Sequence, residues 1–119
     1  MKFIKKWGNM DNRKYKRFDS GNLLSYVCLD EHNKIIQQGM GKTIDVSEGG
    51  ILLETHVAIN PDYTILLSIG LEDEMADIKG SVIYSRKRGD GMIESGIKFK
   101  NIEGECQSIL AAFIKKFHM

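Results

Sequence analysis

Two polar residues close together in this sequence have the types and spacing of a ligand-binding turn. Asp45 and Ser47 lie two positions apart, at what we expect to be the end of a strand. Alternation along a strand directs both side chains to the outer face of a sheet, and directs Ile44 and Val46 to the inner face. The sequence therefore predicts a carboxylate and a hydroxyl side by side on an exposed surface.

Two glycines and an upstream pair of arginines supply what such a surface needs to bind an anion. Gly49 and Gly50 have no Cβ, so we expect them to be free to take a positive φ and to let a ligand approach the backbone. Arg13 and Arg17 lie on a segment that we expect to be flexible enough to fold back over this surface. Their planar guanidinium groups bind anions through paired hydrogen bonds. Together these residues indicate a binding site for an anionic, flat ligand.

The size and composition predict one folded domain that would position these residues. The chain has 119 residues, of which 42% are hydrophobic and 28% charged, as is ordinary for a globular protein. Its 17 Lys and Arg nearly balance its 16 Asp and Glu, but cations crowd residues 1–17, where only Asp11 opposes them. We therefore divide the chain into a flexible basic N-terminal arm, 1–21, and a domain, 22–119.

Short stretches with the pattern of β-strands fill most of the domain, and turns of hairpin length connect them. Ile35 and Ile36 extend the first hairpin before Gly39. Alternation places Val57 on the apolar face of the third strand and Tyr84 on the apolar face of the fifth. The six predicted strands are residues 22–30, 41–46, 51–57, 63–71, 77–86 and 92–99.

The end of the chain changes to a helical period. Apolar residues recur there at steps of three and four, which predicts an amphipathic helix over about 102–117. Several antiparallel strands and one terminal helix suit a barrel, because closure removes exposed strand edges. The predicted fold is mainly β: a six-stranded antiparallel β-barrel with a C-terminal α-helix and a flexible N-terminal arm.

The order and spacing of the two motifs resemble those of a known family. An R-x-x-x-R pair, Arg13 and Arg17, precedes D-x-S-x-x-G, Asp45 to Gly50, at the start of a β-hairpin. This combination is similar to the PilZ domain family, the bacterial receptors for cyclic di-GMP. The resemblance covers residues 13–117, and the joint match is more specific than either motif by itself.

The resemblance implies a role for each motif residue. Arg13 and Arg17 would bind guanine edges and phosphates. Asp45 and Ser47 would bond to polar groups of guanine or ribose, and Gly50 would leave room for the ligand. A carboxylate can accept from the N1–H and N2–H groups of guanine, which a phosphate cannot offer, so the acid favours recognition of a base.

Three further residues bear on this site. Gly96 and Lys98 lie on the outward face of the last predicted strand and are weaker candidates for ligand contact. In the family, the residue before the first arginine is thought to influence whether one ligand or a stacked pair binds. Here that residue is the neutral Asn12, so the stoichiometry stays open.

Other interpretations stay open beside the receptor hypothesis. Asp and Ser side chains often cap turns, glycines often form them, and a run of arginines and lysines can simply be a solvated surface. The main alternative function is a PilZ-like barrel that binds no nucleotide and serves as a protein-interaction module. A nucleic-acid-binding barrel, which Tyr15 and Phe18 would permit, is not favoured.

The sequence offers no pattern that indicates catalysis or a metal site. It has no Ser/His/Asp set, paired acids or P-loop, and His32, His56 and His118 are scattered. Cys28 and Cys106 lie apart in apolar surroundings, which favours two reduced, packed thiols. We therefore expect a non-enzyme without a metal or a cofactor other than its ligand.

The sequence and the family resemblance also lead to expectations about location and partners. No apolar run is long enough for a signal-peptide core or a membrane span, so we expect a cytoplasmic protein. Its expected partners are cyclic di-GMP and a downstream protein effector. Binding is expected to order the N-terminal arm over the ligand and so to change the surface shown to that effector.

Overall fold

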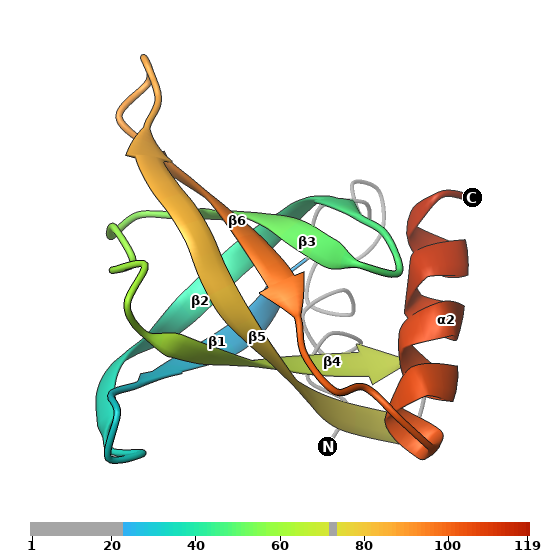
Figure 1. Ribbon diagram of the computed structural model, residues 1–119. Coiled ribbons are helices and arrows are strands. Elements are labelled where there is room, and N and C mark those ends of the chain that lie inside the picture. Colours follow the sequence, from blue (N-terminus) through green and yellow to red (C-terminus); the bar gives the residue numbers. More distant parts are fainter. Residues whose placement is uncertain (1–22, 72–73) are drawn as a thin grey trace.

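Six antiparallel strands close into a barrel, as predicted (Figure 1). The computed structural model describes residues 23–71 and 74–119. Around the barrel the strands follow the order β1-β2-β3-β6-β5-β4, and the pairing of β1 with β4 closes the ring. The elements are β1 (Leu23–Leu29), β2 (Ile35–Val46), β3 (Gly50–Thr55), β4 (Thr64–Leu71), β5 (Glu74–Lys87), β6 (Ile93–Phe99) and α2 (Glu105–Phe117). The predicted fold class is confirmed, whereas the arm at 1–21 lies outside the described residues.

Alternating apolar side chains fill the barrel interior. In β1, Leu24, Tyr26 and Cys28 are buried, and the residues between them are partly exposed. The same period along β3, β4 and β6 brings one apolar face of each strand to a common core. The core thus fixes the register of the strands, since a slip of one residue would turn every apolar side chain outward.

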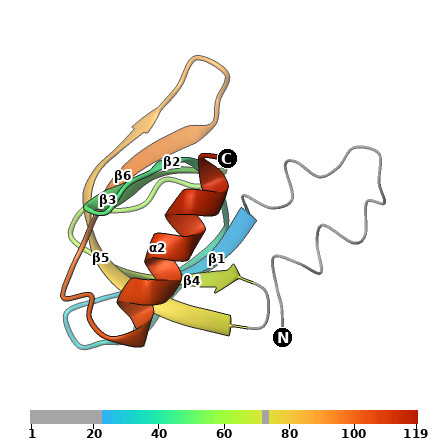
Figure 2. The same ribbon diagram turned by 90° about the vertical axis from the view of Figure 1, so that its right-hand side faces the viewer.

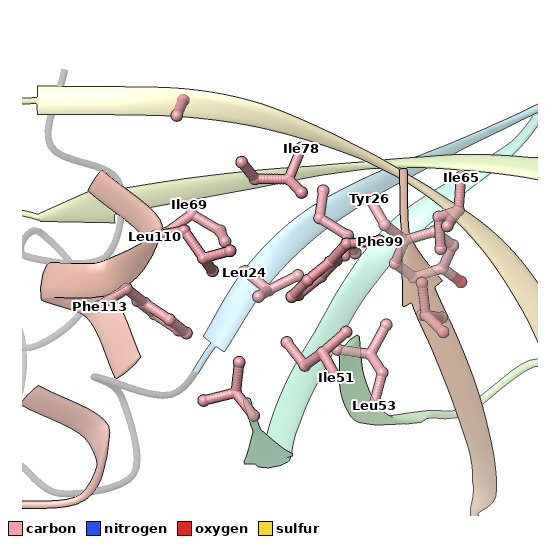
Figure 3. Packing of buried hydrophobic residues seen from close by; sticks show 14 of the residues in the cluster. Leu24, Tyr26, Ile51, Leu53, Ile65, Ile69, Ile78, Phe99, Leu110 and Phe113 are labelled. Atoms are coloured by element: carbon pink, nitrogen blue, oxygen red, sulfur yellow. The ribbon is translucent and has the colours of Figure 1, made fainter. Parts of the chain in front are cut away.

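The helix α2 covers one end of the barrel (Figure 2). Its buried residues are Ile109, Leu110 and Phe113, as the helical period predicted. Figure 3 shows Leu110 and Phe113 directed from the helix toward the interior, where Ile69 and Leu24 of the strands lie. The helix therefore completes the core at an end where the barrel would otherwise expose it.

The helix begins at Glu105, three residues later than predicted. Ile102 still packs against the core, so its place in the apolar period reflects burial outside the helix. Gly104 has a φ of 62°, a conformation that favours glycine and does not continue an α-helix. Glu105 in the first turn and Lys115 and Lys116 in the last turn then complement the helix dipole.

Strand β2 is longer than predicted, because Gly39, where we expected the first hairpin to end, lies within it. The predicted strand covered 41–46 only. A Cβ on Gly39 would lie 3.1 Å from the Tyr26 hydroxyl oxygen, and one on Gly41 would lie 2.7 Å from Leu53 Cγ. These glycines make room for large side chains of neighbouring strands, so β2 continues through them and pairs with both β1 and β3.

Two register shifts change which side chains face outward. The pairing of β2 with β3 shifts at Ile44, so the buried residues there are Thr43 and Val46, and the expected inward position of Ile44 is wrong. The pairing of β5 with β6 shifts at Ile83, and Tyr84, expected on the apolar face, is 41% exposed. Each bulge adds one residue to its strand and reverses the alternation beyond it.

The expected burial of Val57 is also wrong. Strand β3 ends at Thr55, whose buried hydroxyl donates a hydrogen bond of 2.7 Å to the Val57 carbonyl oxygen. This bond turns the chain out of the sheet, and the Val57 side chain is 59% exposed.

Candidate ligand-binding site

A cleft of about 320 Å³ lies on the outer face of the barrel, where β2, β3, β5 and β6 run side by side. It is lined by all of the predicted site residues that the structure describes: Asp45, Ser47, Gly49, Gly50, Gly96 and Lys98. Arg13 and Arg17, the other two predicted residues, lie outside the described residues. Two segments that are far apart in sequence therefore meet in one cleft.

The strand register explains how these segments meet. Asp45 of β2 lies opposite Leu52 of β3, and Leu52 lies opposite Gly96 of β6. Gly96 in turn lies opposite Tyr84 of β5. The four residues form one row across the outside of the barrel, with the carboxylate at one end and the aromatic ring at the other. Both bulges are needed for this row, because each one redirects an end residue outward.

Local hydrogen bonds hold the turn that carries the motif. The Ser47 N–H donates to the Gly50 carbonyl oxygen at 2.9 Å, and the Gly49 N–H donates to the Ser47 hydroxyl at 3.3 Å. The Val46 N–H donates to Oδ1 of Asp45 at 2.9 Å. Asp45 and Ser47 thus do act as turn-capping residues. Within the described residues Oδ2 of Asp45 has no hydrogen bond, and 68% of this side chain is exposed.

The C-terminal end of α2 also reaches this turn, which the sequence did not indicate. His118 follows the last helical residue, and its Nε2 lies 3.0 Å from the Val46 carbonyl oxygen and 3.9 Å from Oδ1 of Asp45. The ring of Phe117 meets the His118 ring edge to face at 5.1 Å between centroids. His118 is at the surface, as expected, but it connects the helix to the site.

The two motif glycines have different surroundings, and neither has the positive φ that we expected. A Cβ on Gly50 would collide with the backbone carbonyl oxygen of Ile97 in β6, whereas one on Gly49 would meet no atom within 4 Å. Gly50 is therefore required for the close approach of β3 and β6, whether or not a ligand is present.

Lys98 provides positive charge in the lining of the cleft. It lies opposite Gly50 in the pairing of β6 with β3. Its side chain makes no ion pair within the described part of the chain. An anionic ligand in the cleft would therefore meet an ammonium group that no described carboxylate neutralises.

The ring of Tyr84 forms the far end of the cleft and was missed by the sequence analysis. A Cβ on Gly96 would lie 2.5 Å from Cε2 of Tyr84, so the ring occupies the space above this glycine. The guanidinium carbon of Arg86 lies 5.7 Å from the ring centroid, and Arg86 also pairs with Glu94 at 3.3 Å. A tyrosine and a glycine on neighbouring strands were the sequence signal for this contact. The bulge at Ile83 turns Tyr84 to the outer face, which simple alternation does not predict.

Residues 23–71 and 74–119 contain no group of three or more His, Cys, Asp or Glu side chains that could hold a metal ion. No helix among them has the length and apolar character needed to cross a bilayer.

A closed six-stranded antiparallel barrel with a capping C-terminal helix, and with a D-x-S-x-x-G turn on its outer face, defines a class of small β-barrel domains. The sequence matches the family described as PilZ domain over residues 11–116. The chain therefore belongs to the PilZ domain family, a family of cyclic di-GMP receptors.

A solved structure shows the same fold at low sequence identity. It is that of MrkH from K. pneumonia in its apo state, with a TM-score of 0.55 and 13% identity. The match covers 87% of the present chain and 48% of MrkH, so this chain spans about half the length of that protein. No curated protein matches the chain by sequence.

Proposed function

We propose that this protein is a receptor for cyclic di-GMP that binds its ligand in the cleft between the motif turn and β6. The observation that carries the proposal is the convergence of six predicted residues on one cleft, since they come from two distant segments of the chain. Membership of the PilZ domain family supports the same ligand.

The motif turn is suited to recognise a guanine edge. Oδ1 of Asp45 is used by the backbone of the turn, and Oδ2 is directed to no other described group. A carboxylate oxygen accepts from the N1–H and N2–H of guanine, and Ser47 can donate its hydroxyl proton while accepting from Gly49. These two residues would therefore hold one base in a fixed orientation.

Cations would bind the phosphates. Lys98 lines the cleft and has no ion-pair partner among the described residues. In the proposal, Arg13 and Arg17 add bidentate hydrogen bonds to phosphate oxygens or to guanine O6 and N7. The volume of about 320 Å³ is at the lower end of the range for ligand pockets, so we expect the arm to supply the remaining contacts.

The proposed mechanism is binding coupled to ordering of the arm. Ligand phosphates and guanines would give the arginines directional partners, and fixing the arm costs about 1–2 kcal/mol per backbone residue. The ordered arm would then present a new surface to a protein effector, without chemical turnover of the ligand. The cytoplasmic location stays a prediction.

Isothermal titration calorimetry of the full chain tests the proposal, with GTP and single-stranded RNA as controls. We expect saturable binding of cyclic di-GMP and no binding of GTP or RNA. We expect Arg13→Ala and Arg17→Ala each to weaken it by roughly 2–4 kcal/mol, since a charged donor pair is lost. Absence of heat with cyclic di-GMP in the folded protein would refute the proposal, and equal binding of RNA would point to a nucleic-acid function.

A further inference from the structure

Two large apolar side chains are exposed inside the candidate cleft. Ile83 is 57% exposed and Tyr84 is 41% exposed, and both line the cleft opposite the polar motif turn. Isolated exposed apolar residues are common on protein surfaces. These two differ because they are adjacent, lie in a concavity and are turned outward by the same bulge. Bulges often redirect a side chain beside a functional site.

One side of the Tyr84 ring packs against the backbone of β6 at Gly96, and part of the rest of the ring is exposed to solvent. Cε2, Cζ and Cδ2 of the ring would lie 2.5, 2.9 and 3.1 Å from a Cβ on Gly96. The ring therefore rests on the backbone of β6, and only a glycine at position 96 permits this. Because 41% of Tyr84 is still accessible, its exposed side faces the cleft.

A guanidinium group lies over the ring of Tyr84. The guanidinium carbon of Arg86 is 5.7 Å from the ring centroid, and the Arg86 side chain is 69% exposed and pairs with Glu94. Nucleic-acid bases stack on aromatic side chains, and arginine adds cation–π attraction at such sites. A tyrosine ring with an arginine beside it therefore suits a planar base.

Tyr84 and Asp45 lie at opposite ends of the row of four residues. Asp45, Leu52, Gly96 and Tyr84 lie on four neighbouring strands, so three strand spacings, roughly 14 Å along the sheet, lie between the two ends. A single base held by its edge at Asp45 would not also cover Tyr84. Cyclic di-GMP carries two guanines, which matches two base-binding positions at opposite ends of one cleft.

We propose that Tyr84, with Ile83 beside it, is a stacking platform for the second guanine of the ligand. This inference rests on the proposed function. Stacking is tolerant of base identity because every base has a π face. In this arrangement Asp45 selects guanine through hydrogen bonds, whereas Tyr84 contributes affinity that does not depend on the base.

Two substitutions of Tyr84 separate stacking from a purely structural role. Tyr84→Phe keeps the ring, and Tyr84→Leu keeps an apolar cover over Gly96 without a π face. We expect Phe to bind cyclic di-GMP as wild type does. We expect Leu to weaken binding about 5- to 140-fold, the equivalent of about 1–3 kcal/mol at 1.4 kcal/mol per factor of ten. Ile35→Ala, an exposed apolar residue outside the cleft, is the control and should leave binding unchanged.

Calorimetry measures the affinity of each variant for cyclic di-GMP, and a thermal unfolding curve checks that the variant is folded. Equal affinity of wild type and Tyr84→Leu would overturn the stacking proposal while leaving the receptor function intact. Equal losses in Tyr84→Phe and Tyr84→Leu would also overturn it, because the hydroxyl and not the ring would then be responsible. If wild type does not bind at all, the proposed function fails first.

A fluorescent variant tests the same contact should Tyr84→Leu fail to fold. Tyr84→Trp in a Trp7→Phe background places the only tryptophan of the chain at the platform. Direct stacking of guanine on the indole should quench its emission with a midpoint that matches the calorimetric affinity. Full binding by calorimetry without a change in emission would place the base elsewhere and overturn the proposal.

Discussion

Nε2 of His118, just beyond the end of α2, lies 3.0 Å from the carbonyl oxygen of Val46 in the motif turn. A carbonyl oxygen can only accept, so this contact needs the proton on Nε2. Asp45 lies 3.9 Å from the same nitrogen. The helix that caps the barrel is therefore hydrogen-bonded to the turn that carries the candidate site.

His118→Ala should lower the free energy of unfolding by about 0.5–1.5 kcal/mol, because it removes this hydrogen bond at a partly exposed position. His32→Ala is the matched control, since His32 is more exposed and its side chain lies 3.6 Å from the exposed Glu31 on the same turn. Urea denaturation of both variants measures the difference. Equal stability of the two variants would show that the His118 contact contributes nothing in solution.

Asp45→Asn should separate the turn-capping role of this residue from ligand binding. The amide keeps one oxygen for the Val46 N–H, so the unfolding midpoint should change little. The second oxygen becomes an NH₂ donor facing the N–H groups of guanine, and we expect cyclic di-GMP affinity to fall by about 1.5–3 kcal/mol. Wild-type affinity in this variant would exclude the carboxylate from base recognition.

Gly50→Val should abolish binding because it disrupts the fold around the site. Its Cβ would collide with the Ile97 carbonyl oxygen, and relief requires β3 and β6 to separate, at a cost of about 1–3 kcal/mol or more. Gly49→Ala, where a Cβ meets open space, should be as stable as wild type. Circular dichroism melting curves compare them, and a Gly50→Val protein with a wild-type melting curve would contradict the packing argument.

Limited trypsin digestion tests whether ligand orders the arm. Lys14, Lys16 and Arg17 are cleavage points within it, and saturating cyclic di-GMP should slow cutting there. Cutting at Lys115 and Lys116 in α2 should keep the same rate and serves as the internal control. Equal cutting of the arm with and without bound ligand would contradict the ordering mechanism, although the receptor function could stand.

The strands could be predicted from sequence because their apolar residues alternate around one core. The order of the strands around the barrel depends on pairing between distant segments, which local alternation does not encode. The same pairing places Asp45 and Gly96 on either side of Leu52. The motif match to a known family predicted the site, and the structure then placed its described residues in one cleft.

The main errors arose at single residues that change local geometry without changing composition. Ile44 and Ile83 are ordinary strand residues by type, yet each is the extra residue of a bulge, so Tyr84 was assigned to the wrong face. Gly39 was expected to end the first hairpin, but it makes room for the Tyr26 side chain within β2. Only the three-dimensional packing distinguishes these roles.

Amide chemical-shift mapping during titration with cyclic di-GMP would both detect binding and locate it on the barrel. We expect large saturable changes at residues 45–50, 83–84 and 96–98, and small changes at the distant turn of residues 30–34. Saturable changes centred away from this cleft, or none at a large excess of ligand, would contradict the proposed function.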